Sequence, residues 1–313
     1  MRCRTVDDIA REALRIISEE KSVCPESGAE FFFRGEERNY KSDSDNEEFT
    51  ADFQSLLDRR GFAKYECELY QEAMRLNVAS FEDDHTMVER LARMQHYALP
   101  TRFADMSTNM LLSAHFACGA HKSMSDRCVE RDGFIRVMKV RRDRMKSFTS
   151  DIIIAISHLP LVPAGRINPS QENGLGYLTY EVKNDRPGFI SEKDDKEIGE
   201  LLRRQIQQVW GFKPMMNSRR IRIQGGLFLA FGCGDGKEPL KPTFSVSDYE
   251  NPYAPSYGIK QIGYVRIAAE AKPVIREQLR YFGMEAESVY PELSNVCEKL
   301  DMRFQKIKQE DEK

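Results

Sequence analysis

The sequence predicts a single α+β domain, with helices packed around a split sheet of antiparallel or mixed strands. Segments with the pattern of a strand lie far apart along the chain among segments of helical periodicity, which favours this class. The 313 residues contain no internal repeat and no Pro- or Ser-rich stretch long enough to separate two domains. We therefore expect one domain at residues 25–300, preceded by an amphipathic helix at 1–24 and followed by a charged tail at 301–313.

Helices are predicted where apolar residues recur every three or four positions. The first, at 5–20, carries Val6 and Ile9 on its apolar face. Ser191 with Asp194 forms a capping box for a helix in the second half of the chain. The other predicted helices span residues 49–60, 62–79, 85–97, 107–119, 151–157, 271–282 and 291–309.

Strands are predicted where aromatic residues cluster or where apolar and polar residues alternate. Residues 30–34 should form a buried aromatic strand that ends at Arg34, where Gly35 allows the backbone to turn. Residues 133–140 alternate as a half-buried strand does. The remaining predicted strands lie at 177–182, 220–231 and 263–268, and the predicted loops at 41–48, 164–190 and 232–258.

Composition is typical of a globular protein of the cytoplasm. Hydrophobic residues make up 41% and charged residues 31% of the chain. The seven cysteines form no CxxC pair and the N-terminus has no apolar leader, so reduced thiols are expected. No apolar run reaches the roughly 20 residues of a membrane helix, so no membrane partner is expected. A net charge of −3 does not indicate a generally basic nucleic-acid binder, although a local basic face remains open.

Residues 91–119 combine two apolar helices with a high density of unlike polar groups between them. Pro100 disfavours helix at the residue before it, so the chain is expected to turn there into an irregular loop. A binding or catalytic site needs such a density of polar groups, whereas a solvated loop does not. These polar residues are His96, Tyr97, Thr101, Arg102, Asp105, Ser107, Thr108 and Asn109.

Each polar candidate also has a structural interpretation. The planar guanidinium of Arg34 suits a phosphate or carboxylate of a ligand, and an internal ion pair is the structural alternative. His96 is favoured at a helix C-terminus by the helix dipole, and could act near neutral pH if a partner such as Asp105 orients it. Asp105 could instead pair with Arg102, three residues away.

Capping is the structural alternative for Ser107, Thr108 and Asn109, which open the second helix. The functional interpretation is a polar surface beside the free N–H groups of the helix N-terminus, where an anion or amide could bind. Gln224 precedes two glycines on a predicted strand, and either satisfies buried backbone or faces a ligand. The histidines lack metal-ligand spacing, so no metal site is predicted, and the GxxxxGK[ST] and GxGxxG motifs are absent.

Four segments of the chain resemble the FRG domain family, which is named for a Phe-Arg-Gly motif. The motif stands here at residues 33–35, and the longest similar segment is MQHYALPTRFADMSTNMLLSAHFA at 94–117. Residues 220–228 and 289–293 follow in the order of the family. The resemblance implies an FRG-type domain over most of the chain.

A more distant similarity links the chain to the ADP-ribosyltransferase fold. It lies in the order of an Arg at the end of an early strand, a Ser-Thr-Asn segment before an A-x-F-A helix, and a Gln-bearing late strand. Those enzymes arrange an Arg or His, a Ser/Thr or Tyr, and a Glu around NAD. The similarity implies NAD as cofactor, catalytic roles for Arg34, His96, Ser107 and Gln224, and NAD contacts from Arg34, Gly35, Tyr97, Thr101, Arg102, Asp105, Thr108 and Asn109.

The late strand departs from that pattern, because Gln224 is neutral and Gly226 stands where a QxE motif would supply glutamate. Either another acid such as Asp105 enters the site, or a nucleotide is bound without turnover. Three hypotheses follow. The first is a toxin- or defence-related, NAD-dependent ADP-ribosyltransferase that modifies a protein or nucleic acid. The second is a non-catalytic module that binds a nucleotide or a partner, and the third is a nuclease that uses His96 and Asp105. The residues expected to line one pocket are Arg34, His96, Arg102, Ser107 and Gln224.

Overall fold

A computed structural model describes the chain up to residue 290, with gaps. The described residues are 1–23, 28–40, 53–119, 131–162, 167, 169, 175–185, 194–216, 222–223, 226–234, 238–242 and 244–290. The predicted loop at 41–48, the predicted helix at 291–309, the tail at 301–313 and Gln224 lie outside them. Within the described ranges, no helix is both long enough and apolar enough to span a membrane.

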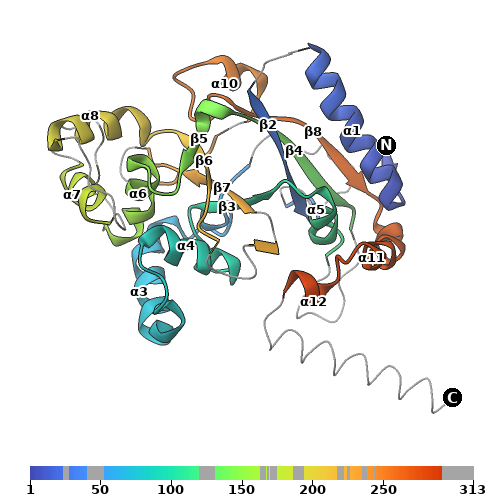
Figure 1. Cartoon of the computed structure of the whole chain (residues 1–313), viewed down its shortest axis with the longest axis horizontal. Helices are drawn as coiled ribbons and strands as arrows, with labels where there is room; N and C mark the ends of the chain where they lie inside the picture. Colours follow the sequence, from blue (N-terminus) through green and yellow to red (C-terminus); the bar gives the residue numbers. More distant parts are fainter. Residues whose placement is uncertain are drawn as a thin grey trace.

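Eight strands form one sheet at the centre of the molecule (Figure 1). They are β1 (Arg2–Cys3), β2 (Ala29–Glu36), β3 (Phe103–Ser107), β4 (Gly133–Arg141), β5 (Met145–Ser147), β6 (Val209–Lys213), β7 (Gly226–Phe231) and β8 (Ile259–Ile267). Their order in the sheet is β1-β8-β4-β2-β3-β7-β6-β5. The β1–β8 and β5–β6 pairs are parallel and the other pairs antiparallel, so the predicted mixed α+β architecture is confirmed.

The sheet is least continuous between β2 and β3. These strands share a single register pair, Phe33 opposite Ser107. In contrast, β2 pairs with β4 along its whole length, and β3 pairs with β7 along its whole length. The sheet is therefore split into two halves, β1-β8-β4-β2 and β3-β7-β6-β5, that meet at one point.

Most of the described helices gather in two groups, one over each half of the sheet, while α10 lies apart from both (Figure 1). They are α1 (Val6–Val23), α2 (Leu56–Arg59), α3 (Glu66–Asn77), α4 (Met87–His96), α5 (Met110–Ala117), α6 (Asp151–His158), α7 (Gly176–Asn184), α8 (Asp195–Gln205), α10 (Val246–Glu250), α11 (Lys272–Tyr281) and α12 (Ala286–Val289). Helices α1, α5 and α11 bury Ile9 and Ile135 with the first half. Helices α3, α4, α6, α7 and α8 bury Ile154 and Phe228 with the second half.

Helix α5 packs close to β2 and β4 because glycines face it. A Cβ atom on Gly35 would overlap the carbonyl oxygen of Ser113 and lie 2.8 Å from the amide nitrogen of Ala117. A Cβ atom on Gly133 would overlap the carbonyl oxygen of Ala117. The prediction that the backbone turns at Gly35 is wrong, because β2 continues to Glu36 and Gly35 keeps a negative φ. Gly35 instead makes room for the helix backbone.

Three predicted segments differ in the structure. Residues 103–107, predicted as irregular loop, form β3 because β7 offers them a complete antiparallel partner. Residues 177–182, predicted as a short strand, lie in α7. The apolar side chains of this helix recur at helical spacing and pack in the core beside the second half of the sheet. The predicted strand at 220–231 begins only at Gly226, and residues 222–223 are helical.

Other predicted elements are confirmed with shifted ends. Residues 133–140 are buried along the whole strand instead of half-buried, because helices cover one face and the segment 244–259 covers the other. Ser191 lies outside the described residues, and Asp194 caps α8 in a capping box with Glu197. The predictions at 5–20, 85–97, 151–157 and 271–282 correspond to α1, α4, α6 and α11, and those at 30–34, 133–140 and 263–268 to β2, β4 and β8.

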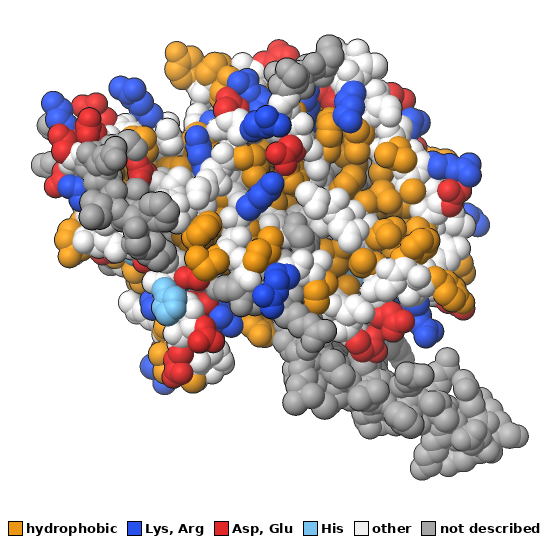
Figure 2. Space-filling model, in the orientation of Figure 1, with side chains coloured by type: hydrophobic (Ala, Val, Ile, Leu, Met, Phe, Trp, Pro, Cys, Tyr) orange, Lys and Arg blue, Asp and Glu red, His pale blue; other side chains and the backbone are white. Residues whose placement is uncertain are grey.

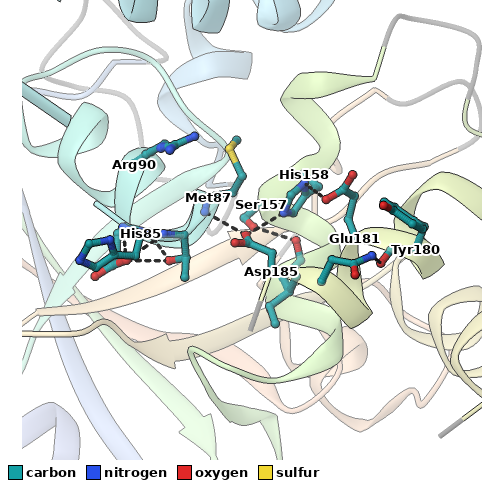
Figure 3. Close-up of polar contacts among 12 residues, drawn as sticks. His85, Met87, Arg90, Ser157, His158, Tyr180, Glu181 and Asp185 are labelled. Atoms are coloured by element: carbon teal, nitrogen blue, oxygen red, sulfur yellow. Dashed lines mark hydrogen bonds and ion pairs between the residues drawn. The ribbon is translucent and has the colours of Figure 1, made fainter. Parts of the chain in front are cut away.

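A buried polar contact holds the second helix group together (Figure 3). Nε2 of His158, the last residue of α6, lies 2.7 Å from Oδ2 of Asp185. The backbone N–H of Met87, at the start of α4, donates to the same oxygen at 3.0 Å. Glu181 stands on the other side of the ring, 3.6 Å from Nδ1. Asp185 thus anchors the N-terminus of α4, whose opposite end carries His96.

Candidate functional site

A small pocket opens where β2 and β3 separate, between α5 and the C-terminal end of α4. Its free volume is about 310 Å³ including open solvent, and it has room for little more than one water molecule. Helices α4 and α5 belong to different groups, so the pocket marks the junction of the two halves of the sheet. Its lining residues are Phe33, Arg34, Gly35, His96, Asp105, Met106, Ser107, Leu112, Ser113, Phe116, Gly226 and Phe228.

Arg34 crosses the split between the two halves. Its Nη1 donates to the backbone oxygen of Asp105 at 2.6 Å and to the carboxylate Oδ1 at 2.9 Å. Its Nε lies 3.6 Å from Oε1 of Glu36, and only 11% of the Arg34 side chain is exposed. The internal ion pair that was the structural alternative for Arg34 is thus present. The prediction that the strand ends at Arg34 is wrong, because β2 continues to Glu36. The guanidinium joins β2 to β3 where the ladder has no further pairs.

Both members of this pair are charged at neutral pH. Burial by itself would raise the pKa of Asp105, but the charge of Arg34 and its hydrogen bond outweigh burial and lower the pKa to about 2. Burial likewise opposes the charge on Arg34, yet the carboxylates of Asp105 and Glu36 raise its pKa. The pocket therefore presents a fixed carboxylate next to a fixed guanidinium.

Asp105→Asn is expected to lower the free energy of unfolding at pH 7 but not at pH 2. Since the folded pKa lies below the ordinary value of 3.8, the ion pair stabilises the fold above about pH 4 and loses this effect as the pH falls toward 2. The Asp105 side chain is 38% exposed, so solvent screening limits the effect to about 1 kcal/mol. Urea unfolding of both proteins across this range measures it, and a difference independent of pH would contradict the prediction.

The C-terminal end of α4 brings two polar side chains to the site. The ring of His96 is buried and packs edge-to-face on Phe228, with 5.5 Å between the ring centroids. Nε2 of Gln95 donates to Oδ1 of Asp105 at 3.3 Å. Oε1 of Gln95 accepts from Oγ1 of Thr101 at 2.9 Å. Thr101 therefore supports Asp105 through Gln95, from a buried position behind the pocket.

Ser107, Thr108 and Asn109 have three different roles. Ser107 ends β3 and lines the pocket, and its Oγ accepts from the backbone N–H of Asn109 at 2.9 Å. Of the three residues expected to cap the second helix, Ser107 and Thr108 do not do so. Asn109 is the cap, because its Oδ1 accepts from the N–H groups of Leu111 and Leu112 at 3.0 and 3.3 Å. Thr108 is exposed.

Arg102 lies away from the pocket, and the expectation that it lines the site is wrong. Its Nε and Nη2 donate to the two carboxylate oxygens of Glu66 at 2.6 and 2.8 Å, and its Nη1 donates to the carbonyl oxygen of Gly232 at 3.1 Å. The side chain is 0% exposed, so its charge serves the fold. Tyr97 is also outside the pocket lining and is largely exposed.

The structure therefore brings Arg34, Gly35, His96, Asp105 and Ser107 together. Gln224 is outside the described residues, but the start of β7 two residues later lines the pocket.

Sequence reasoning did not single out Gln95 or Glu36, both of which contact the Arg34–Asp105 pair. Glu36 stands two residues after Arg34, and residues two apart in a strand lie on the same face. A predicted strand that continued past residue 34 would therefore have placed both on one face. Gln95 precedes His96 in the longest FRG-like segment, and nothing local distinguishes it from a solvated glutamine.

Of the comparisons with known proteins, one finds a match, to part of the chain. Residues 29–126 match the family model described as FRG domain. A search of curated proteins and a search of solved structures found no match. The matched residues include β2, α4, β3 and α5, and so most of the pocket wall.

Proposed function

This chain carries an FRG domain, matched at residues 29–126, and from that premise we propose that it transfers ADP-ribose from NAD to a macromolecular acceptor. The observation that supports the proposal is the register of three strands. Ser107 on β3 lies opposite Phe33 on β2 and opposite Gly226 on β7. The three segments that carry the similarity to ADP-ribosyltransferases thus meet at one pocket, although they are distant in sequence.

The proposed chemistry uses the fixed carboxylate of Asp105. Loss of nicotinamide breaks the bond between its ring nitrogen and C1′ of the ribose, the electron pair stays on nicotinamide, and positive charge develops at C1′. An ionised carboxylate stabilises such a centre. Asp105 lines the pocket and supplies the charge that β7 lacks at Gly226. The acceptor nucleophile then bonds to C1′, and we assign His96 to accept its proton.

The size of the pocket constrains how NAD would bind. The pocket as it stands takes a group no larger than water, so entry of a nicotinamide ring requires side chains on the α5 wall, such as Leu112 and Phe116, to move. The aromatic rings of Phe33 and Phe228 and the hydroxyl of Ser107 provide apolar and polar surfaces suited to an aromatic amide. The rest of the dinucleotide would lie outside, along the split.

The test is the release of nicotinamide from NAD. We expect wild type to release it and Asp105→Asn to lower kcat by roughly 100-fold with little change in KM, because the carboxylate acts on charge that develops only in the transition state. Asp143→Asn is the matched control, since that carboxylate is exposed and pairs with Arg141 on the surface. Circular dichroism of both variants checks that they fold as wild type does.

A non-catalytic nucleotide-binding module is the second candidate, and one observation favours it. Arg34 is already neutralised by Asp105 and Glu36. Its guanidinium therefore stabilises the split before any ligand arrives. NAD binding by calorimetry without release of nicotinamide would support this second candidate. Absence of NAD binding by wild type would overturn the transferase.

A further inference from the structure

Two guanidinium groups stack on Tyr40, just beyond the end of β2. Cζ of Arg59 lies 4.0 Å from the centroid of the Tyr40 ring, and Cζ of Arg38 lies 5.2 Å from it. Arg59 is the last residue of α2, so a separate element brings it to this ring. We call Arg38, Tyr40 and Arg59 the Tyr40 cluster.

The cations of the Tyr40 cluster differ from Arg34 in their partners. Arg34 is held by Asp105 and Glu36. Among the described residues, no carboxylate forms an ion pair with either cation of the cluster. Glu37 is the neighbouring acid, and its Oε1 accepts a hydrogen bond from the Tyr40 hydroxyl at 3.1 Å. On the face drawn in Figure 2, acidic and basic side chains are interspersed.

Arg59 carries its charge at an electrostatic cost. Burial and then the positive charge of Arg34 lower the pKa of Arg59, and the charges of Glu36, Tyr40 and Asp105 only partly oppose this. The same interactions show that Arg59 lies within electrostatic reach of the Arg34–Asp105 pair. A charge kept partly buried without a paired acid is stabilised when an anion arrives.

We propose that the Tyr40 cluster is an anion site that binds the diphosphate group of a nucleotide. Two planar guanidinium groups offer forked donors that match phosphate oxygens. Stacking on one tyrosine ring orients both before the ligand arrives, which reduces the entropy lost on binding. If the proposed function holds, this site takes the diphosphate of NAD while the ribose and nicotinamide face Asp105. Binding itself requires no turnover.

The experiment is calorimetric titration of the full chain with ADP and with inorganic pyrophosphate. We expect Arg59→Gln to bind both at least about tenfold more weakly than wild type, since a charged hydrogen-bonding contact is lost. Arg60→Gln is the matched control, because Arg60 is the next residue, is exposed and lies outside the cluster. Tyr40→Phe keeps the ring and should bind like wild type, whereas Tyr40→Ala should bind more weakly.

Thermal unfolding without ligand provides a second readout. Arg59→Gln should unfold at the same temperature as wild type or a higher one, because it removes a partly buried charge that forms no ion pair with a described carboxylate and is repelled by Arg34. A large fall in this temperature would assign Arg59 to the scaffold and overturn the proposal. So would wild-type protein that binds neither probe, or Arg59→Gln protein that binds both as tightly as wild type.

Failure of this site and failure of the transferase give different results. ADP binding that depends on Arg59, in a protein that releases no nicotinamide from NAD, supports the Tyr40 cluster and overturns the transferase. Release of nicotinamide by an Arg59→Gln protein with unchanged ADP affinity supports the transferase and overturns the cluster.

Discussion

Gly35→Ala is expected to lower the free energy of unfolding by about 3 kcal/mol or more, a large part of the stability of a typical domain. The added Cβ would overlap the carbonyl oxygen of Ser113 and approach the amide nitrogen of Ala117 to 2.8 Å. Both are backbone atoms of α5, so neither can rotate away as a side chain could. Strand β2 and α5 must separate, which opens the core that contains Phe33 and Ala114.

Urea unfolding followed by circular dichroism measures this loss. Gly176→Ala is the matched control, because Gly176 opens α7 and no atom lies within 4 Å of an added Cβ there. The control should match wild type or gain slightly from the helix propensity of alanine. If Gly35→Ala were as stable as the control, close packing of α5 would not explain why glycine stands at this position.

Arg102→Met is expected to lower the free energy of unfolding by about 3–5 kcal/mol, because it removes the guanidinium that pairs with the buried carboxylate of Glu66. Arg102 and Glu66 are 0% and 3% exposed and join through two hydrogen bonds of 2.6 and 2.8 Å. The substitution also leaves the carbonyl oxygen of Gly232 without the donor at 3.1 Å. Chemical denaturation of the two proteins measures the difference.

Arg75→Met is the matched control for Arg102→Met. Arg75 also binds a glutamate, Glu72, through its Nε and Nη2, but that pair is exposed and screened by solvent, so its loss should leave the free energy of unfolding close to that of wild type. Adding Glu66→Leu to Arg102→Met should recover much of the loss, since the buried carboxylate that lost its guanidinium partner is then removed as well. If Arg102→Met protein were as stable as wild type but bound nucleotide more weakly, Arg102 would belong to the binding site and the prediction would be wrong.

These two variants bear on how the family match is interpreted. Gly35 and Arg102 both lie within the matched residues 29–126, yet the structure gives both of them packing and charge-pairing roles. Arg34 is intermediate, because it lines the pocket while its guanidinium joins the halves of the sheet. Membership of the matched segment therefore does not by itself assign a residue to ligand binding.

The sequence by itself determined the elements whose pattern is strong over a short window. Helices α1, α6 and α11 and strands β2 and β4 were predictable because apolar residues recur at helical spacing or cluster in a β-favouring run. The order of the FRG-like segments also predicted that Arg34 and Ser107 would converge, and both line the pocket. In each case the information lies in neighbouring residues or in a recognisable motif.

Only the tertiary structure shows that residues 103–107 form a strand, what role Gly35 has, and which acids pair with the arginines. Phe103–Ser107 contains Asp and Ser and follows a proline, so its local pattern indicates a loop, but the ladder with β7 makes it a strand. Arg34 and Asp105 stand 71 positions apart, and Arg102 and Glu66 stand 36 apart. Which acid neutralises which arginine depends on distances between remote segments. The free energy of those contacts exists only once the sheet has assembled, and no local window of sequence contains it.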